Sequence, residues 1–223
     1  MKLRSAVVLA IVFVLAFAVP GIFAEEGKFA LSAKAGTLGL GLEGAANLSS
    51  NFNARLGFNT FSYDYDGTES EIHYDFELDL QSVAGLVDWF PFEQGLRFTG
   101  GVLLNMNELD LTATPSGSYD IGGVTYTSAQ VGSLTGKLDF DDVAPYVGVG
   151  WGNPFGRKGN LSFNFDLGFM FQGSPKVSVS TNGTLSSNAA FLADLEREKN
   201  DLEGDLDDFD IYPVIAFGIT YKF

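Results

Sequence analysis

The segment Leu161–Phe171, which reads LSFNFDLGFMF, decides the fold class of this chain. Large apolar residues occupy each odd position of the segment, whereas the even positions, apart from Met170, hold small or polar residues such as Ser162 and Asp166. Successive side chains of a strand point to opposite faces of a sheet, but a helix would scatter these apolar residues around its axis. The segment is therefore a β-strand with one apolar face and one polar face.

The last residues of the chain repeat this alternation. One face carries Ile211, Pro213, Ile215, Phe217, Ile219, Tyr221 and Phe223. In a soluble β-sandwich, which is the alternative, such an apolar face points inward, whereas in a membrane barrel it points to lipid. The polar face with its Asp and Arg suits a crowded lumen, and aromatic residues such as Trp89 and Trp151 gather at segment ends, as in a membrane-interface belt. These features favour the barrel.

Composition supports the same class. The chain has 27 Gly and 21 Phe and is 46% hydrophobic, yet beyond the N-terminus no apolar run reaches the length of a membrane helix. It has no cysteine, which excludes disulfides and thiolate metal sites. Its net charge of −15 argues against nucleic-acid binding, because nucleic acids are held by basic surfaces.

The N-terminus has the pattern of a secretory signal peptide. Lys2 and Arg4 precede an apolar run, and the small residue Ala24 stands at a suitable cleavage position. We therefore predict that residues 1–24 are cleaved and that residues 25–223 form an outer-membrane β-barrel.

Strand and loop lengths predict the topology. The expected strands are 28–36, 38–46, 52–63, 72–89, 96–110, 137–151, 161–178 and 209–223. A tight bend near residues 36–38 is assumed because bacterial barrels have an even number of strands and keep both termini in the periplasm. The prediction is an all-β fold, namely an antiparallel, up-and-down transmembrane barrel of eight strands.

The long connections, 64–70, 112–135 and 180–208, are expected outside the cell, because outer-membrane barrels have short periplasmic turns. Within residues 112–135, Gly122 and Gly123 predict a small hairpin. Residues 187–206 predict one short helix in the last extracellular loop, since its apolar residues recur at helical spacing. A solvated helix on the barrel rim is expected, and a lid or partner-binding helix is the alternative.

Four segments carry a resemblance to a known family. They read AGTLGLGLE at 35–43, VAPYVGVGWG at 143–152, GSPKVSV at 173–179 and YPVIAFGITYKF at 212–223. The chain resembles the small outer-membrane barrels related to the carbapenem-susceptibility porin, a family linked to uptake of ornithine and other basic amino acids. The resemblance implies an eight-stranded barrel, but no substrate-binding motif is matched residue by residue.

The C-terminal strand also resembles the signal that the barrel-assembly machinery reads. Gly218, Tyr221 and the terminal Phe223 match its spacing, although Ala216 stands where a polar residue is expected. The expected partners are this machinery, outer-membrane lipids and lipopolysaccharide.

Alternation predicts which charged side chains face the lumen. The predicted set is Lys34, Glu43, Arg55, Asp75, Glu77, Asp79, Arg97 and Asp166. Three acids in the outer half of one strand, above many inward glycines, suggest an acidic vestibule over a narrow passage, which would concentrate cations. We predict a passive channel for small solutes, with cationic solutes such as basic amino acids as candidates.

Two other functions compete with the channel. The first is a closed structural or interaction barrel with a polar plug, acidic extracellular loops and no transport, because eight strands leave little room inside. The second is a soluble periplasmic β-protein, which would be extracted without detergent.

Catalysis and metal binding are not expected from sequence motifs. The single histidine, His73, lies at the predicted rim, and no nucleophile occupies a diagnostic motif. The acidic residues around Gly67 superficially resemble a calcium loop but fail the EF-hand spacing. We therefore expect neither an enzyme nor a bound cofactor or metal.

Overall fold

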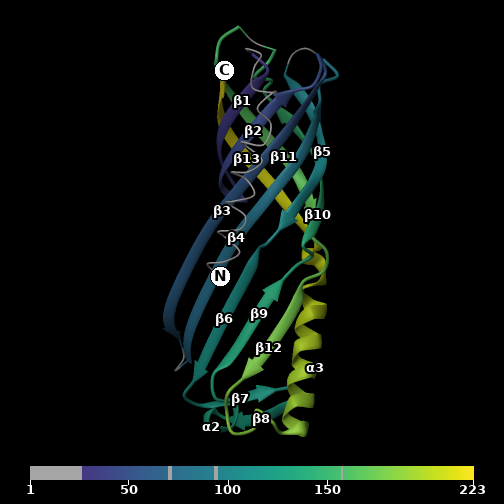
Figure 1. The fold of residues 1–223 in the computed structure, drawn as a ribbon. Helices are drawn as coiled ribbons and strands as arrows, with labels where there is room; N and C mark the ends of the chain where they lie inside the picture. The colour runs from purple at the N-terminus through teal and green to yellow at the C-terminus, as the bar shows by residue number, and fades with distance from the viewer. Residues whose placement is uncertain (1–26, 70–71, 93–94, 157) are drawn as a thin grey trace.

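The computed structural model describes residues 27–69, 72–92, 95–156 and 158–223, and the predicted signal peptide lies outside these ranges. Eight antiparallel strands build the barrel of Figure 1. They are β1 (Phe29–Gly36), β2 (Gly39–Asn47), β3 (Phe52–Glu69), β4 (Ile72–Trp89), β5 (Leu96–Asn105), β10 (Val143–Trp151), β11 (Leu161–Phe171) and β13 (Ile211–Lys222).

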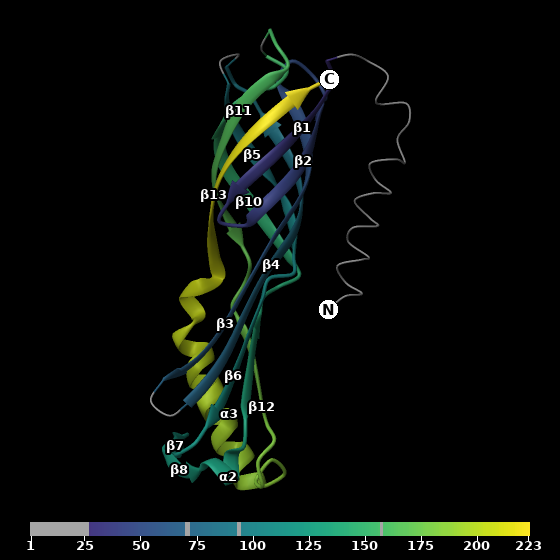
Figure 2. The same cartoon turned by 90° about the vertical axis from the view of Figure 1, so that its left-hand side faces the viewer.

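Strand pairing runs in a ring. It passes from β1 through β2, β3, β4, β5, β10, β11 and β13, and β13 pairs with β1 again. The strands are strongly tilted, as Figure 2 shows. The predicted bend is confirmed, because Gly36 lies opposite Gly39 across a turn, and Gly39 adopts a φ of 94°, which glycine tolerates best. The start of the first strand lies beside the end of the last strand, where Gly27 N donates a hydrogen bond to Phe223 O at 2.7 Å.

Beyond one end of the barrel, a sheet extends well past the ring. The outer halves of β3 and β4 continue in it, beside β6 (Glu108–Pro115), β9 (Leu134–Asp139) and β12 (Lys176–Thr181), in the order β3-β4-β6-β9-β12. We call this five-stranded sheet the extension (Figures 1 and 2).

The extension corrects three predicted strands, 96–110, 137–151 and 161–178, each of which is two strands. The reason lies in the pairing of β4, whose residues 82–89 pair with β5 and whose residues 72–79 pair with β6. The chain therefore leaves the barrel between Asn105 and Glu108 to continue along the same neighbour in the extension.

The far end of the extension carries a small apolar core. The predicted hairpin is confirmed as β7 (Ser118–Ile121) and β8 (Val124–Thr127), followed by the short helix α2 (Ser128–Val131). The predicted helix is confirmed as α3 (Ala189–Asp205), which the short helix η1 (Asp207–Asp210) links to β13. Phe191 and Leu195 of α3 pack with Tyr126 in the core.

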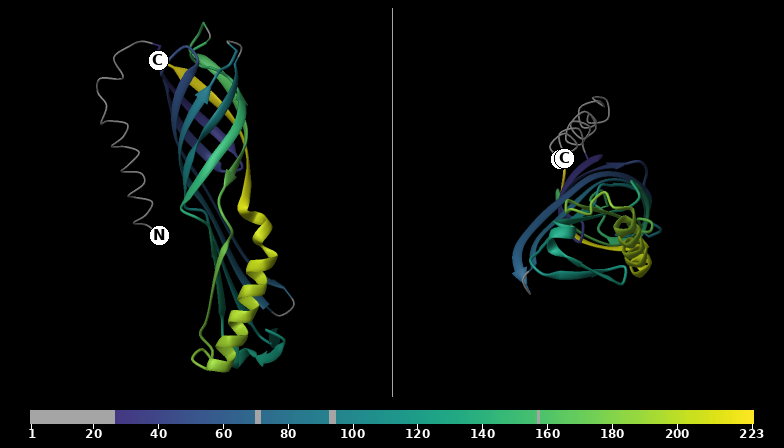
Figure 3. Two further views of the ribbon diagram at one scale, coloured as in Figure 1. Left: turned by 90° about the vertical axis from the view of Figure 1, so that its right-hand side faces the viewer. Right: turned by 90° about the horizontal axis from the view of Figure 1, so that it is seen from below.

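The helix α3 thus does more than rest on the rim: it runs along the extension and is anchored at its far end (Figure 3). Its N-terminus is capped by Asn188, whose side chain accepts hydrogen bonds from the backbone N–H groups of Ala190 and Phe191. Among the described residues, no helix is long and apolar enough to cross a membrane.

The apolar face of the sheet changes sides where β3 and β4 leave the barrel. Within the barrel, β3 turns Phe52 and Leu56 outward, where both are exposed, and buries Arg55. In the extension the outward side carries Asp64 and Asp66, whereas aromatic residues (Phe61, Tyr63 and Tyr65) continue the lumen side. Pairing of β3 with β4 is unbroken across this point, so no bulge causes the change. The outer surface of the barrel therefore meets an apolar medium, and the outer surface of the extension meets water.

Candidate functional site in the barrel lumen

A network of six charged side chains fills the barrel at the end nearer the short turns. Five were predicted to face the lumen: Lys34, Glu43, Arg55, Arg97 and Asp166. The sixth is Asp88 of β4. Their side chains are only 2–9% exposed. With three basic and three acidic members the network is formally neutral, so the lumen here carries no excess negative charge.

Arg55 lies at the centre of the network. Its Nη1 is 3.0 Å from Oε2 of Glu43, its Nε is 2.8 Å from Oδ2 of Asp88, and its Nη2 is 3.4 Å from Oδ1 of Asp166. The planar guanidinium thereby joins carboxylates from three different strands. This contact holds opposite walls of the barrel at fixed positions.

The other two bases close the network around Asp166. Lys34 Nζ lies 3.0 Å from Oε2 of Glu43 and 2.7 Å from Oδ2 of Asp166, and Arg97 Nη2 lies 2.6 Å from Oδ1 of Asp166. Thr99 donates a hydrogen bond to Asp88 at 2.7 Å. A buried charge is tolerated only when it is paired and hydrogen-bonded, and each of the six has an oppositely charged partner.

Glu43 and Arg55, both predicted to face the lumen, form an ion pair although they are not directly opposite each other. Glu43 lies opposite Gly57, and Arg55 lies opposite Ala45, so the two side chains meet diagonally across the strand pair. Sequence reasoning missed Asp88 because it placed the odd-numbered residues of β4 in the lumen. The neighbouring Trp89 was a signal in the sequence that Asp88 faces the lumen. A tryptophan at a strand end belongs to the lipid-facing aromatic belt, and Trp89 is indeed exposed.

An apolar layer fills the lumen beyond the charged network, on the side of the extension. Its buried members are Ala84, Leu86, Leu103, Ala144, Tyr146, Met170 and Val214. Leu38 and Tyr212 pack against them. The layer and the network border a cavity of about 40 Å³, which has room for water but not for a solute the size of an amino acid.

The inward glycines were predicted to line a passage. Instead, they make room for the bulky side chains that fill the lumen. Gly148 and Gly168 lie opposite each other, and a Cβ on either would come within 2.5 Å of the Tyr146 hydroxyl. A Cβ on Gly150 would lie 2.9 Å from Nε of Arg97. Each of these glycines therefore accommodates a bulky inward side chain.

The prediction that Asp75, Glu77 and Asp79 line a vestibule is wrong. In β4 the residues facing the lumen are even-numbered, as the buried Ser82 and Asp88 show. The three acids lie on the opposite face, in the extension, because the apolar face changes sides between the two parts of the strand.

These three acids belong to an acidic outer face of the extension. Cross-strand register places them beside Asp64, Asp66, Glu108, Asp110 and Asp139. Lys137 pairs with Glu108, and Lys176 lies on the edge strand β12, 2.8 Å from Asp141. The acidic side chains that were predicted to lie in the lumen are therefore on the outer surface of the extension.

The predicted assembly-signal residues occupy both faces of the last strand. Gly218 faces inward opposite Lys34 and Asn164. Tyr221 and Phe223 are exposed, with their ring centroids 5.2 Å apart. An exposed aromatic pair next to the strand end is compatible with the predicted signal, which stays a prediction.

Comparison with solved structures identifies the same kind of fold. CarO2 of Acinetobacter baumannii is similar over 87% of this chain and 98% of its own, with 24% identity and a TM-score of 0.57. CarO of the same organism is similar over 88% of this chain and 97% of its own, with 22% identity and a TM-score of 0.54. In fold, the chain resembles the carbapenem-susceptibility outer-membrane proteins. No family model and no curated relative matches the sequence.

Proposed function

We propose that the protein is an integral outer-membrane barrel of a Gram-negative bacterium, closed at rest, which acts through its extension at the cell surface. The filled lumen is the observation that supports the closed state. This function is the interaction barrel that the sequence left as the alternative to a channel.

The outer surface of the barrel supports a position in the membrane. Large apolar residues are exposed around it, among them Phe163 at 70%, Leu40 at 66% and Phe217 at 63%. Exposed apolar surface this extensive is found where lipid, rather than water, is the solvent. The exposed tryptophans Trp89 and Trp151 stand near the end with the short turns, where an aromatic belt meets the head groups.

The change of apolar face supports an orientation. Water-facing acids begin on β3 just beyond Thr60, so the hydrocarbon boundary lies near this residue and the extension stands outside the cell. Outer-membrane lipids and lipopolysaccharide then surround the foot of the acidic outer face, and the barrel-assembly machinery inserts the chain.

The energy needed to open the lumen supports the closed state. A passage through the network would separate Arg55 from three carboxylates, and breaking one buried pair costs about 3–5 kcal/mol. It would also displace Tyr146 from the pocket formed by Gly148 and Gly168. A standing pore for basic amino acids therefore requires a second conformation.

Conductance in planar bilayers tests the proposal. The refolded protein should be electrically silent while it shows the heat-dependent gel mobility of a folded barrel. A general-diffusion porin, reconstituted in the same way, should conduct and so shows that detection works, while the gel mobility shows that the unmodified protein is folded. Discrete cation-selective steps from the unmodified protein would instead establish the channel and refute the closed barrel.

A further inference from the structure

The extension's longest hairpin brings four polar side chains together on its outer face. Asp66 lies directly opposite Asp75, and Thr68 lies directly opposite His73, two residues nearer the tip. Because side chains two residues apart share a face, these four form a compact cross-strand group. The charged members come from both strands, so only the pairing of β3 with β4 assembles them.

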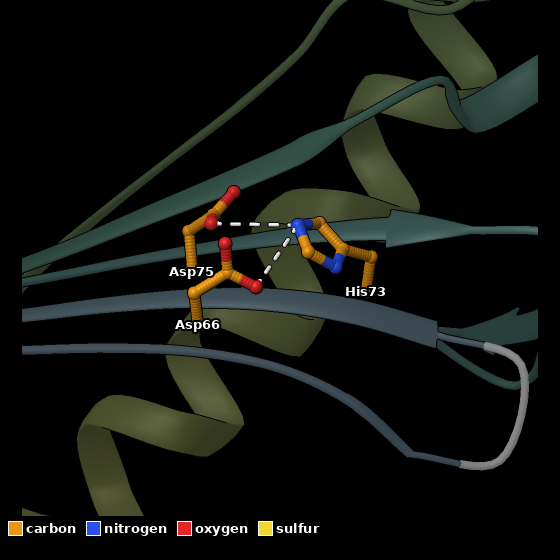
Figure 4. A group of neighbouring side chains, drawn as sticks. All are labelled: Asp66, His73 and Asp75. Atoms are coloured by element: carbon orange, nitrogen blue, oxygen red, sulfur yellow. Dashed lines mark ion pairs between the residues drawn. The ribbon is translucent and has the colours of Figure 1, made fainter.

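The imidazole of His73 is oriented within this group, as Figure 4 shows. Its Nε2 lies 3.6 Å from Oδ1 of Asp66 and 3.5 Å from Oδ1 of Asp75. Its Nδ1 lies 3.3 Å from the hydroxyl oxygen of Thr68. One ligand atom from each of Asp66, His73 and Asp75 can be chosen so that all three lie within 4.8 Å of one another.

Thr68 has the role that orienting partners have in metal sites. When Nδ1–H donates to the threonine hydroxyl, the lone pair of Nε2 points toward the two carboxylates. Metal-binding histidines commonly have their second ring nitrogen held in this way, which selects the tautomer. The group thus offers one imidazole nitrogen and two carboxylate oxygens around one point.

We propose that Asp66, His73 and Asp75 bind a divalent first-row transition-metal ion. Ligand atoms at tetrahedral positions about 2.0–2.1 Å from Zn²⁺ are about 3.3–3.5 Å apart, close to the spacing of Nε2 from both carboxylates. Water completes the coordination, since the side chains of Asp66 and Asp75 are 75% and 56% exposed. Imidazole together with carboxylate suits these ions better than Mg²⁺ or Ca²⁺, which prefer oxygen ligands alone.

The strand pairing itself favours a cation at this point. Asp66 faces Asp75 and Asp64 faces Glu77, so like charges stand directly opposite each other in consecutive pairs. Such pairs are destabilising, and a bound dication offsets the repulsion. Reading the sequence for EF-hand spacing and cysteines could not reveal the site, because its ligands meet only across the hairpin.

A protonated His73 that merely pairs with both acids is the competing arrangement, and Zn²⁺ titration distinguishes the two. The refolded protein, without a polyhistidine tag and freed of metals, is titrated calorimetrically near neutral pH. His73 is the chain's only histidine and there is no cysteine, so imidazole-dependent binding reports on this site alone. We expect one Zn²⁺ per chain.

Three variants define the outcome. His73→Ala and Asp66→Asn each remove a ligand and should weaken Zn²⁺ binding by at least about tenfold. Asp64→Asn is the matched control, because it removes the same charge from the same face without removing a ligand, and should weaken binding much less than Asp66→Asn does. With Co²⁺ in place of Zn²⁺, the visible absorption of a nitrogen-ligated site should appear and should be lost in His73→Ala.

The proposal is overturned if Zn²⁺ does not bind, or if His73→Ala binds it as the unmodified protein does. It is equally overturned if Asp64→Asn weakens binding as much as Asp66→Asn, because the ion would then respond only to the diffuse charge of the acidic outer face. Gel mobility shows that each variant is folded. None of these outcomes depends on whether the lumen conducts, so this proposal and the closed barrel are tested separately.

Discussion

Replacing Arg55 with methionine should be the most damaging single change in the charged network. The substitution keeps an unbranched side chain but removes the guanidinium from Glu43, Asp88 and Asp166. Lys34 and Arg97 are then the two remaining bases for three buried carboxylates, so one negative charge is uncompensated.

The expected loss follows from that imbalance. Removing one partner of a buried ion pair costs about 3–5 kcal/mol, because the other charge stays buried. Urea unfolding of the protein in lipid vesicles should therefore show a midpoint lowered by about 1–2.5 M, for a denaturant slope of about 2–3 kcal/mol/M. Heat-dependent gel mobility should change at correspondingly lower temperature.

The matched control is Arg197→Met on α3. Arg197 pairs with Asp194 at 3.2 Å, but its side chain is 56% exposed, so its removal should cost less than about 1 kcal/mol. If Arg55→Met lowers stability no more than Arg197→Met does, the network does not hold the barrel together. The reasoning from burial and pairing would then be wrong.

Three further predictions concern the packing of the extension and the lumen. Phe191→Ala should release α3 and expose it to protease, since truncating a buried Phe costs about 3–5 kcal/mol, whereas the exposed Leu192→Ala should leave the digestion pattern unchanged. The hydrogen bond from Tyr126 to Asp194 raises the pKa of the tyrosine, so its contribution to α3 docking is present below the ordinary tyrosine pKa of about 10 and is lost as pH rises through the raised value. Asp194→Asn should bring the ultraviolet titration of Tyr126 back toward lower pH, and an unchanged titration would refute the link. Gly168→Ala should lower barrel stability by about 1–3 kcal/mol in urea, because the new methyl group meets a tyrosine hydroxyl and a backbone oxygen; a neutral result would show that the lumen is not tightly filled.

Periodicity in the sequence was enough to predict most of the barrel. The alternation in Leu161–Phe171 and in the last strand predicts strands with one apolar face, and the even-number argument correctly locates the bend before Gly39. The hairpin at Gly122 and the helix α3 were also predictable, because turn glycines and helical spacing are local signals.

The charged lumen was only partly predictable. Period-2 alternation identifies which residues share a face, but it does not say which medium that face meets. The apolar residues of β4 are odd-numbered where the strand faces lipid and even-numbered where it covers the inside of the extension. Because of this change, the sequence placed Asp75, Glu77 and Asp79 in the lumen and left out Asp88, which is the residue that lies there.

The sequence by itself determined the strands, their apolar faces, the turns and the helix, because each depends on neighbours within a few residues. Only the tertiary structure decided which charges meet. Arg55 joins carboxylates of β2, β4 and β11, and His73 meets Asp66 across a hairpin. Such contacts depend on ring closure and strand register, which bring distant positions together without any local trace in the chain.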